Sequence, residues 1–224
     1  MWARIESNNI VEYYDRKQSI VLNNVRYSSQ IFTIWTDAQR KDLGIVPIVI
    51  SGSHLDTRFY IEKDYSDAIA GDGNSVIRTI GVKAADRALA DVNEVWTQSE
   101  IDDGQAPGGT SANDPKLDKD GNQIITRGLK YQAIQKVKKQ QAGFLSQTDW
   151  YIIRKADAGT AIPSNIQTWR NAIRSDATDI ETAITNAADM NAFIALHTDT
   201  YKTVDDEQVV DVIARVNRWT ELGT

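Results

Sequence analysis

The stretch LSQTDWYIIRKADAGTAIPSNIQTWRNAIR, residues 145–174, decides the fold of the C-terminal half, because it holds the signals for a helix, a stop and a second helix. The first helix begins upstream of it. Apolar residues return to one helical face at spacings of 3, 8 and 7, at Ile134, Val137, Leu145 and Ile152. This periodicity predicts one long amphipathic helix from Leu129 to Asp157, ended by Gly159, which adopts the left-handed cap conformation without steric cost.

A second helix is predicted to begin after Pro163. Proline suits the first turn of a helix, Ser164 is a good N-cap residue, and Gln167 stands where a capping box needs it. Trp150 and Trp169 therefore fall on two antiparallel helices joined by a short turn. Because indoles bury much apolar surface, we expect both to pack in the core of a helical hairpin.

The order of these residues resembles the tail assembly chaperone family of tailed bacteriophages. Members of that family join a Leu-x-x-x-Asp-Trp step to a Trp/Tyr-Arg-x-x-Leu/Ile-Arg helix, and the resemblance covers residues 120–197. The positions that carry the motif are Thr148, Asp149, Trp150, Arg154, Pro163, Trp169, Arg170 and Arg174.

The resemblance implies a non-enzymatic phage protein that binds a tail fibre or another tail protein and assists its folding, assembly or attachment. It places the chain in the host cytoplasm during assembly. Fibres expose strand edges and assemble slowly, so a binding partner for them is physically useful. Two alternatives stay open. One is a permanent structural component of the virion tail or fibre tip, and the other is a glycan-binding module whose β-domain aromatics stack on sugars, among them Trp2, Tyr13, Tyr14, Tyr27 and Trp35.

The N-terminal half reads as a small β meander. Short runs rich in β-branched and aromatic residues alternate with turn residues such as Asn8-Asn9 and Asn23-Asn24, which predicts strands over residues 3–5, 10–14, 19–22, 25–27 and 31–35. Thr36 and Gln39 form a capping box for a short helix over 37–44. A strand follows over 45–50, and Pro47 predicts that it is an edge strand or is paired on one side only. Further strands are expected over 58–62 and 75–82, around a turn at residues 71–74.

The chain changes character near residue 100. Ala85, Leu89, Val92 and Trp96 have helical spacing and predict a helix that leaves the β domain. Residues 102–115 are rich in glycine, proline and small polar residues, which indicates a linker or arm. Asp120-Gly121 predicts a small hairpin. The sequence thus predicts an α+β chain with a β-rich domain over 1–101 that holds one or two short helices, an arm over 102–126 and a helical domain over 127–224.

Beyond Gly159 the pattern is helical throughout. Thr178 with Glu181 offers a second capping box that would restart the helix. Near the end, Val209, Val212, Val216 and Trp219 are spaced by 3, 4 and 3, which predicts a last helix capped by Asp205 or Asp206 and closed by Gly223. Its apolar stripe is expected either to fold back on the helical domain or to contact a neighbouring chain.

Composition limits the classes of partner. A net charge of −6 and a pI near 5.0 argue against nucleic-acid binding, which depends on clustered Lys and Arg. The densest basic run, residues 136–139, is expected on a solvated helix face. The longest apolar run, Ile45–Ile50, is too short to span a membrane, and the absence of cysteine suits a reducing cytoplasm.

No constellation of residues indicates catalysis, a metal or a cofactor. The two histidines, His54 and His197, lie in different predicted domains, and neither has a carboxylate or serine at a triad-like spacing. Asp118 to Asn122 begins like a calcium loop, but position 6 is not glycine and position 12 is Leu129, so a plain hairpin turn is favoured. We therefore predict a protein that is not an enzyme.

The division into domains suggests where partners bind. If the motif residues are used in the core of the helical hairpin, the β domain and the arm are left to contact the fibre, at candidate positions Pro47 and Pro107. The Val209–Trp219 stripe would then support self-association into a homo-oligomer.

Overall fold

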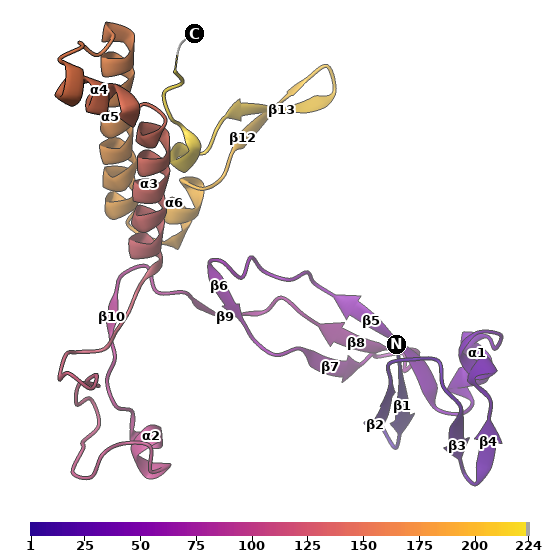
Figure 1. The fold of residues 1–224 in the computed structure, drawn as a ribbon. Helices are drawn as coiled ribbons and strands as arrows, with labels where there is room; N and C mark the ends of the chain where they lie inside the picture. Colours follow the sequence, from indigo (N-terminus) through magenta and orange to yellow (C-terminus); the bar gives the residue numbers. More distant parts are fainter. Residues whose placement is uncertain (223–224) are drawn as a thin grey trace. The chain divides into compact units, whose positions relative to one another are not determined.

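The computed structural model describes residues 1–222, and the chain divides into two compact units, Met1–Asp86 and Arg87–Thr224. The first unit is rich in strands and the second holds the long helices (Figure 1), which confirms the α+β fold. None of the helices within residues 1–222 is both long and apolar enough to cross a bilayer.

A five-stranded sheet forms the first unit. Its strands are β1 (Trp2–Glu6), β2 (Asn9–Tyr14), β5 (Ile45–Ser51), β7 (Ser66–Ile69) and β8 (Val76–Thr79), in the order β2-β1-β5-β8-β7. The pair β5–β8 is parallel and the other neighbours are antiparallel. The predicted turn at residues 71–74 joins β7 to β8. Two further pairs, β3 (Ile20–Leu22) with β4 (Val25–Tyr27) and β6 (Tyr60–Glu62) with β9 (Lys83–Asp86), complete the unit.

The asparagine turns occur where the sequence predicts them. Asn23 and Asn24 have φ of 49° and 66°, so both central residues of the β3–β4 turn are left-handed, as a type I′ turn requires. Ser7 and Asn8 do the same between β1 and β2, with φ of 50° and 61°. Asparagine tolerates this region better than most residues, which is why these hairpins could be predicted locally.

Pro47 lies in a central strand, yet the prediction of one-sided pairing is confirmed. Strand β1 pairs with residues 45–47 of β5, and β8 pairs with β5 from Ile48 onward. The strand therefore changes partner at the proline, whose missing amide removes one ladder donor. The alternative of an edge strand is wrong.

One predicted strand, over residues 31–35, is wrong. Ser29–Phe32 forms a 3₁₀ turn, η1, and the Ser28 hydroxyl accepts a bond from the Gln30 amide. Ile31 and Phe32 are buried beside Tyr14, Ile20 and Ile45, so tertiary packing overrides the strand propensity. The capping box is confirmed: Thr36 and Gln39 bond reciprocally at the start of α1 (Asp37–Lys41).

The predicted helix over residues 85–96 does not form. Ala85 belongs to β9, and Val92 lies in β10 (Val92–Asn93), which pairs with β11 (Ile125–Thr126). The backbone between them bonds to the start of α3 (Leu129–Ser146), where the amides of Leu129 and Lys130 donate to the carbonyls of Ala88 and Leu89. Helical spacing was misleading here because long-range pairing takes the hydrogen bonds that a helix would need.

The arm has its own hydrogen-bonded structure. The amide of Asn113 donates to Trp96 O at 2.8 Å, and α2 (Gln98–Asp102) begins with a capping box of Thr97 and Glu100. The Asp118 carboxylate accepts from the amides of Asp120 and Asn122, which confirms the hairpin turn predicted there.

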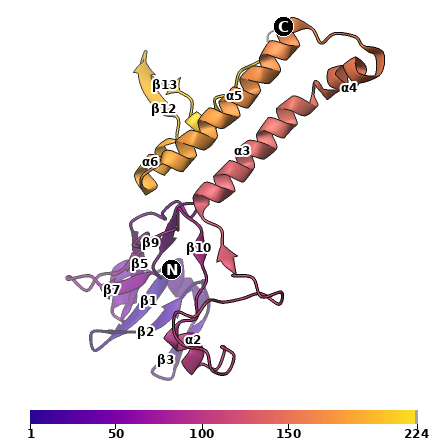
Figure 2. The same ribbon diagram turned by 90° about the vertical axis from the view of Figure 1, so that its left-hand side faces the viewer.

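The C-terminal unit is built on α3 (Leu129–Ser146) and α5 (Ser164–Asn186), which lie side by side and antiparallel (Figure 2). The short helices α4 (Asp149–Ala158) and α6 (Met190–Ala195) flank them. Buried residues along α5 face α3 and repeat with helical spacing: Ile166, Trp169, Ile173, Ala177, Ile180 and Ile184. The basic residues Lys136, Lys138 and Lys139 are exposed on α3 and Val137 between them is buried, as predicted.

The prediction of a single helix over Leu129–Asp157 is wrong, because the helix ends at Ser146 and a new one begins at Asp149. Gly159 does cap α4, with φ of 69°. Ser164 makes no capping bond, since Pro163 takes the N-cap position. Helix α5 also continues through Thr178, whose hydroxyl donates to Arg174 O within the helix, so no restart occurs there.

The segment predicted to form the last helix forms a β-hairpin instead. Strands β12 (Thr200–Val204) and β13 (Glu207–Val212) are joined by Asp205 and Asp206, whose φ values of 52° and 64° give a type I′ turn where a helix cap was expected. A short 3₁₀ turn, η2 (Arg215–Asn217), follows. The predicted C-terminal cap, Gly223, lies outside the described residues.

Candidate protein-binding surface

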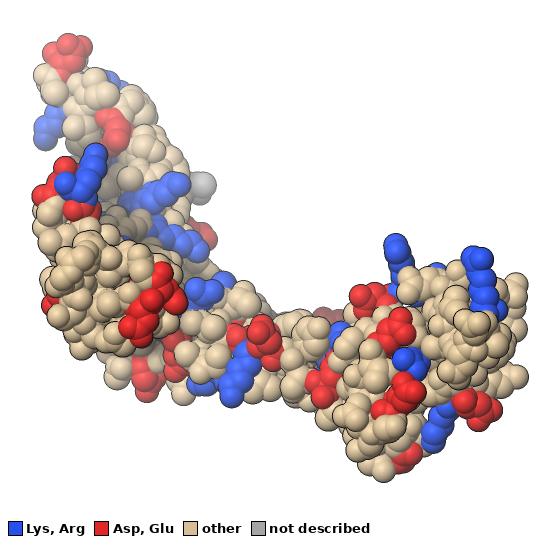
Figure 3. Space-filling model, turned by 90° about the horizontal axis from the view of Figure 1, so that it is seen from below, with Lys and Arg blue, Asp and Glu red and all other residues tan. Residues whose placement is uncertain are grey.

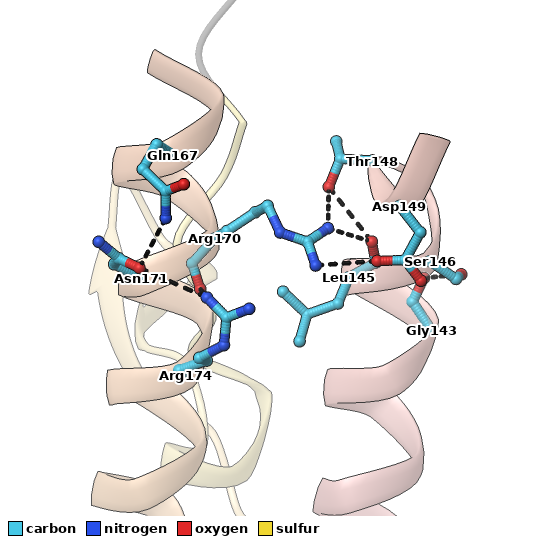
Figure 4. Close-up of polar contacts among 9 residues, drawn as sticks. All are labelled: Gly143, Leu145, Ser146, Thr148, Asp149, Gln167, Arg170, Asn171 and Arg174. Atoms are coloured by element: carbon cyan, nitrogen blue, oxygen red, sulfur yellow. Dashed lines mark hydrogen bonds and ion pairs between the residues drawn. The ribbon is translucent and has the colours of Figure 1, made fainter. Parts of the chain in front are cut away.

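Three of the motif residues, Thr148, Asp149 and Arg170, meet at the corner between α3 and α4, where Arg170 reaches across from α5 (Figure 4). Arg170 is only 5% exposed. Its Nη1 donates to Leu145 O and to Thr148 Oγ1, each at 2.7 Å, and its Nη2 donates to Asp149 Oδ1 at 2.8 Å. The guanidinium thus satisfies a carbonyl at the end of one helix and holds a carboxylate at the start of the next. We call Arg170, Leu145, Thr148 and Asp149 the corner cluster.

The two motif tryptophans have different roles. Trp169 is buried, as predicted, and its indole Nε1 donates to Thr220 O at 3.0 Å. Trp150 is 50% exposed, so its predicted core position is wrong. The reason is the break after Ser146: α4 leaves the axis of α3, and the face that carries Trp150 no longer points at α5.

Helix α4 buries none of its residues. Trp150 stacks on Tyr151 with 3.7 Å between ring centroids, and the Arg154 guanidinium lies 4.8 Å from the Trp150 ring and 5.2 Å from that of Tyr151. Ile153 is 67% exposed and Ile152 is also exposed. We call Trp150, Ile153 and Arg154 the α4 patch; Ile152 lies on another face of the helix, because residues two apart do not share a helical face. Stacking limits the rotamers of the indole before any partner arrives, which lowers the entropic cost of binding.

The remaining motif residues support the helices. Pro163 starts α5 after the Gly159 turn, at a place where its missing amide costs nothing. Arg174 is exposed, and its Nη1 donates to Arg170 O at 3.3 Å along the same helix. Arg174 therefore does not join the corner cluster, although it lies one turn away in sequence.

The other predicted interface residues are dispersed. Pro47 is half-buried in β5, and Val209 and Val212 lie in the β12–β13 hairpin. Val216 is buried, and Trp219 packs on Phe144 with ring centroids 5.1 Å apart, so this segment folds back on the chain's own helices.

Pro107 is exposed in the arm, where an open pocket of about 350 Å³ is lined by Trp96, Pro107, Thr110, Asp114, Pro115 and Leu117.

Ionisable groups in the arm and the sheet have structural partners. Lys116 bonds to Glu100 at 2.5 Å, and together with the Thr97 bonds it lowers the pKa of Glu100 to about 2. In the sheet, the Arg78 guanidinium forms two bonds to Asp67 and lowers the pKa of that carboxyl group, although burial opposes the shift. Arg78 also lies over the rings of Tyr13 and Tyr65. No sequence pattern predicts this second cluster, because its members come from β2, from β7 and the residue before it, and from β8.

The histidines are in the environments expected of ordinary surface residues. His54 is exposed and its Nδ1 lies 2.9 Å from Glu62 Oε2. His197 is half-buried against the Phe193 ring. No group of three or more His, Asp or Glu side chains within residues 1–222 is arranged to hold a metal ion. Acidic and basic side chains are interspersed on the face of the molecule seen in Figure 3.

No protein-family model, curated protein or solved structure matches the chain. Function is therefore inferred from the chain's own residues and their contacts. Sequence reasoning missed the exposure of α4 and the C-terminal hairpin. The Asp205-Asp206 pair between two runs rich in Val and Thr was the available signal for the hairpin.

Proposed function

We propose that the chain is a non-enzymatic protein of a tailed bacteriophage that binds a tail fibre or another tail component and assists its folding, assembly or attachment. The likeness of residues 145–174 to the tail assembly chaperones supports this proposal. Two of the motif residues, Thr148 and Asp149, are more than twenty residues from Arg170 in the sequence, and all three meet at one corner where Arg170 and Thr148 are buried.

The observation that carries the proposal is the exposed α4 patch. A helix that lies inside the motif and buries no residue has little value for the core, so its apolar side chains are available to a partner. Trp and Arg are the residue types most enriched among the residues that dominate binding energy at protein interfaces. We therefore place the fibre contact on α4. The β domain and the arm are candidate contacts only if Trp150 is a core residue, and Trp150 is exposed.

Packing weakens the glycan-binding alternative and the expected self-association of the Val209–Trp219 stripe. Four of the five aromatics considered for glycan stacking pack in the core of the β unit, where Trp2 and Tyr14 contact Phe32, and Tyr27 contacts Trp35. The helical stripe expected to support self-association does not exist, because its residues are divided between a hairpin and a 3₁₀ turn.

The test is co-purification of the full chain with the tail fibre of the same phage, for the native chain and for Trp150→Ala. Truncation should weaken fibre binding at least about tenfold, in the range of interface hot spots, and leave the folding of the chain intact. Tyr131→Ala is the matched control, since Tyr131 is also an exposed helical aromatic, with the Arg127 guanidinium 4.5 Å from its ring. Equal fibre binding by Trp150→Ala and the native chain would refute the placement on α4.

A second measurement separates an assembly factor from a permanent tail component. Mass spectrometry of purified virions should find the chain absent, or far below the amount of the fibre, if it leaves after assembly. Stoichiometric presence would instead assign it to the finished tail.

A further inference from the structure

The β12–β13 hairpin is a sheet of only two strands. Tyr201 pairs with Val210, Lys202 with Val209 and Val204 with Glu207, around the two-residue turn. Among residues 1–222 no third strand pairs with either of its edges. A two-stranded hairpin is at best marginally stable in water, and it usually needs another strand or a packed face.

The base of the hairpin is held firmly. Asp199 Oδ1 accepts a bond from the Ala214 amide at 2.6 Å, and the Val216 amide donates to Leu196 O at 3.1 Å. Val216 itself is buried. The hairpin is therefore anchored where it leaves the helices, and the unsupported part is its outer length.

That outer length exposes apolar side chains. Tyr201, Val204, Val210 and Val212 all lie in strands and are all exposed, as is Ile213 just beyond. Unpaired strand edges with apolar side chains are templates for another chain. Backbone hydrogen bonding restricts the occupant to one shape, because only an extended segment can pair along an edge.

The turn determines which amides point outward. In a type I′ turn the residues on either side, here Val204 and Glu207, form the hydrogen-bonded pair next to the turn. Antiparallel pairs alternate between bonded and non-bonded. On β13, the amides of Gln208 and Val210 therefore face away from β12. By the same alternation, Thr203 presents its amide at the opposite edge, on β12.

Charge distinguishes between possible occupants. Residues 200–212 hold one lysine and four carboxylates, which gives a net charge of −3. Lys202 already bonds to Asp211 at 3.0 Å. If β13 paired with a second copy about Val209, Glu207 would lie opposite Asp211 of that copy, and like charges placed directly opposite are destabilising.

We propose that the outer edge of β13 binds an extended segment of another protein as a third strand, and that this segment carries Lys or Arg among β-branched or aromatic residues. The added strand satisfies the amides of Gln208 and Val210, covers the exposed valines and compensates the acidic turn. This site is separate from the α4 patch and does not depend on the proposed phage function.

The probe is a blocked peptide of about eight residues that alternates Val and Lys, a length typical of strands, titrated into the full chain. Amide hydrogen exchange should show new protection at Gln208 and Val210. Val210→Pro removes an outward donor and should weaken peptide binding about tenfold. Thr203→Pro is the matched control, because it blocks the β12 edge alone, and it should bind the peptide as the native chain does.

Three outcomes would overturn the proposal. The first is equal binding of a Val/Glu peptide, which would remove the charge argument. The second is peptide binding without protection at Gln208 and Val210, which would mean attraction without strand pairing. The third is a concentration-dependent dimer of the chain that Val210→Pro abolishes, which would assign the edge to a second copy.

Discussion

Arg170 and Arg174 belong to the same motif and the same helix, but they differ in burial and in hydrogen-bond partners. The Arg170 guanidinium is buried and bonds to Leu145 O, Thr148 Oγ1 and Asp149 Oδ1. Arg174 is exposed and bonds only within α5. A buried polar group that loses its partner incurs a desolvation cost, whereas an exposed one turns to water.

Arg170→Ala should therefore lower the free energy of unfolding by about 1.5–3 kcal/mol, the range for hydrogen bonds to charged groups. The ion pair with Asp149 adds little, because that carboxylate is half exposed. Arg174→Ala should change it by less than about 0.5 kcal/mol. Urea unfolding followed by circular dichroism measures both. Equal losses would mean that the corner cluster does not stabilise the fold.

The two tryptophans allow a second comparison at this scale. Trp169→Ala should cost about 3–5 kcal/mol, because it leaves a cavity where the buried indole lay. Trp150→Ala should cost about 1 kcal/mol or less, since a half-exposed side chain leaves no closed cavity. Thermal unfolding of the two variants is the measurement, and a Trp150→Ala loss as large as that of Trp169→Ala would return Trp150 to the core.

At the scale of elements, the arm is stabilised by polar contacts because it holds few apolar ones. Glu100 connects α2 to Lys116 further along the arm. Its carboxylate accepts a bond from the amide of the N-cap residue Thr97 and bonds to Lys116, whose Nζ lies 4.8 Å from the Trp96 ring centroid. The pKa of Glu100, about 2, lies below the ordinary value near 4.5. A carboxyl group with a lowered pKa stabilises the folded state while it is charged.

The arm should accordingly be fully ordered above about pH 4.5 and should open as the pH falls toward about 2, where Glu100 takes up a proton. The indole N–H resonance of Trp96, followed by NMR through this range, reports the change. Glu100→Gln should make that resonance independent of pH in the same window. A native chain whose Trp96 signal does not move down to pH 2 would show that Glu100 does not hold the arm.

At the scale of the whole molecule, the two units have separate cores. Tyr14, Ile20, Ile31 and Ile45 are buried together in the first unit. The second is built around the residues of α5 that face α3, with Ile173, Ile180 and Ile184 fully buried. Units with their own cores are able to unfold separately.

Calorimetry of the full chain should therefore resolve two transitions. Ile45→Ala should lower the midpoint temperature of one transition and Ile173→Ala that of the other, because truncating a buried Ile to Ala lowers the free energy of unfolding by roughly 2–5 kcal/mol. Both residues are fully buried, so each variant is the other's control. A single transition that both variants shift would mean that the units fold as one.

What the sequence by itself determined is local chemistry. The asparagine turns, the capping box of Thr36, the left-handed Gly159 and the Asp118 turn all occur where the sequence predicts them, and so does the α+β class. Each depends on the conformational preference or hydrogen bonding of a few neighbouring residues. Of the candidate site, the resemblance to the tail assembly chaperones singled out Trp150, Arg154 and Arg170, but the helical spacing placed Trp150 in the core and did not show that it is exposed.

Only the tertiary structure decided where a helical spacing of apolar residues corresponds to a helix. Apolar spacing was the same across Ser146 and Asp149, yet the helix breaks there, and Arg170 from α5 occupies the corner. The valines from Val209 onward had helical spacing, yet they form a hairpin. A repeat of three or four residues says which side chains can share a face. Which face is buried depends on groups tens of residues away, and their hydrogen bonds and packing decide the outcome.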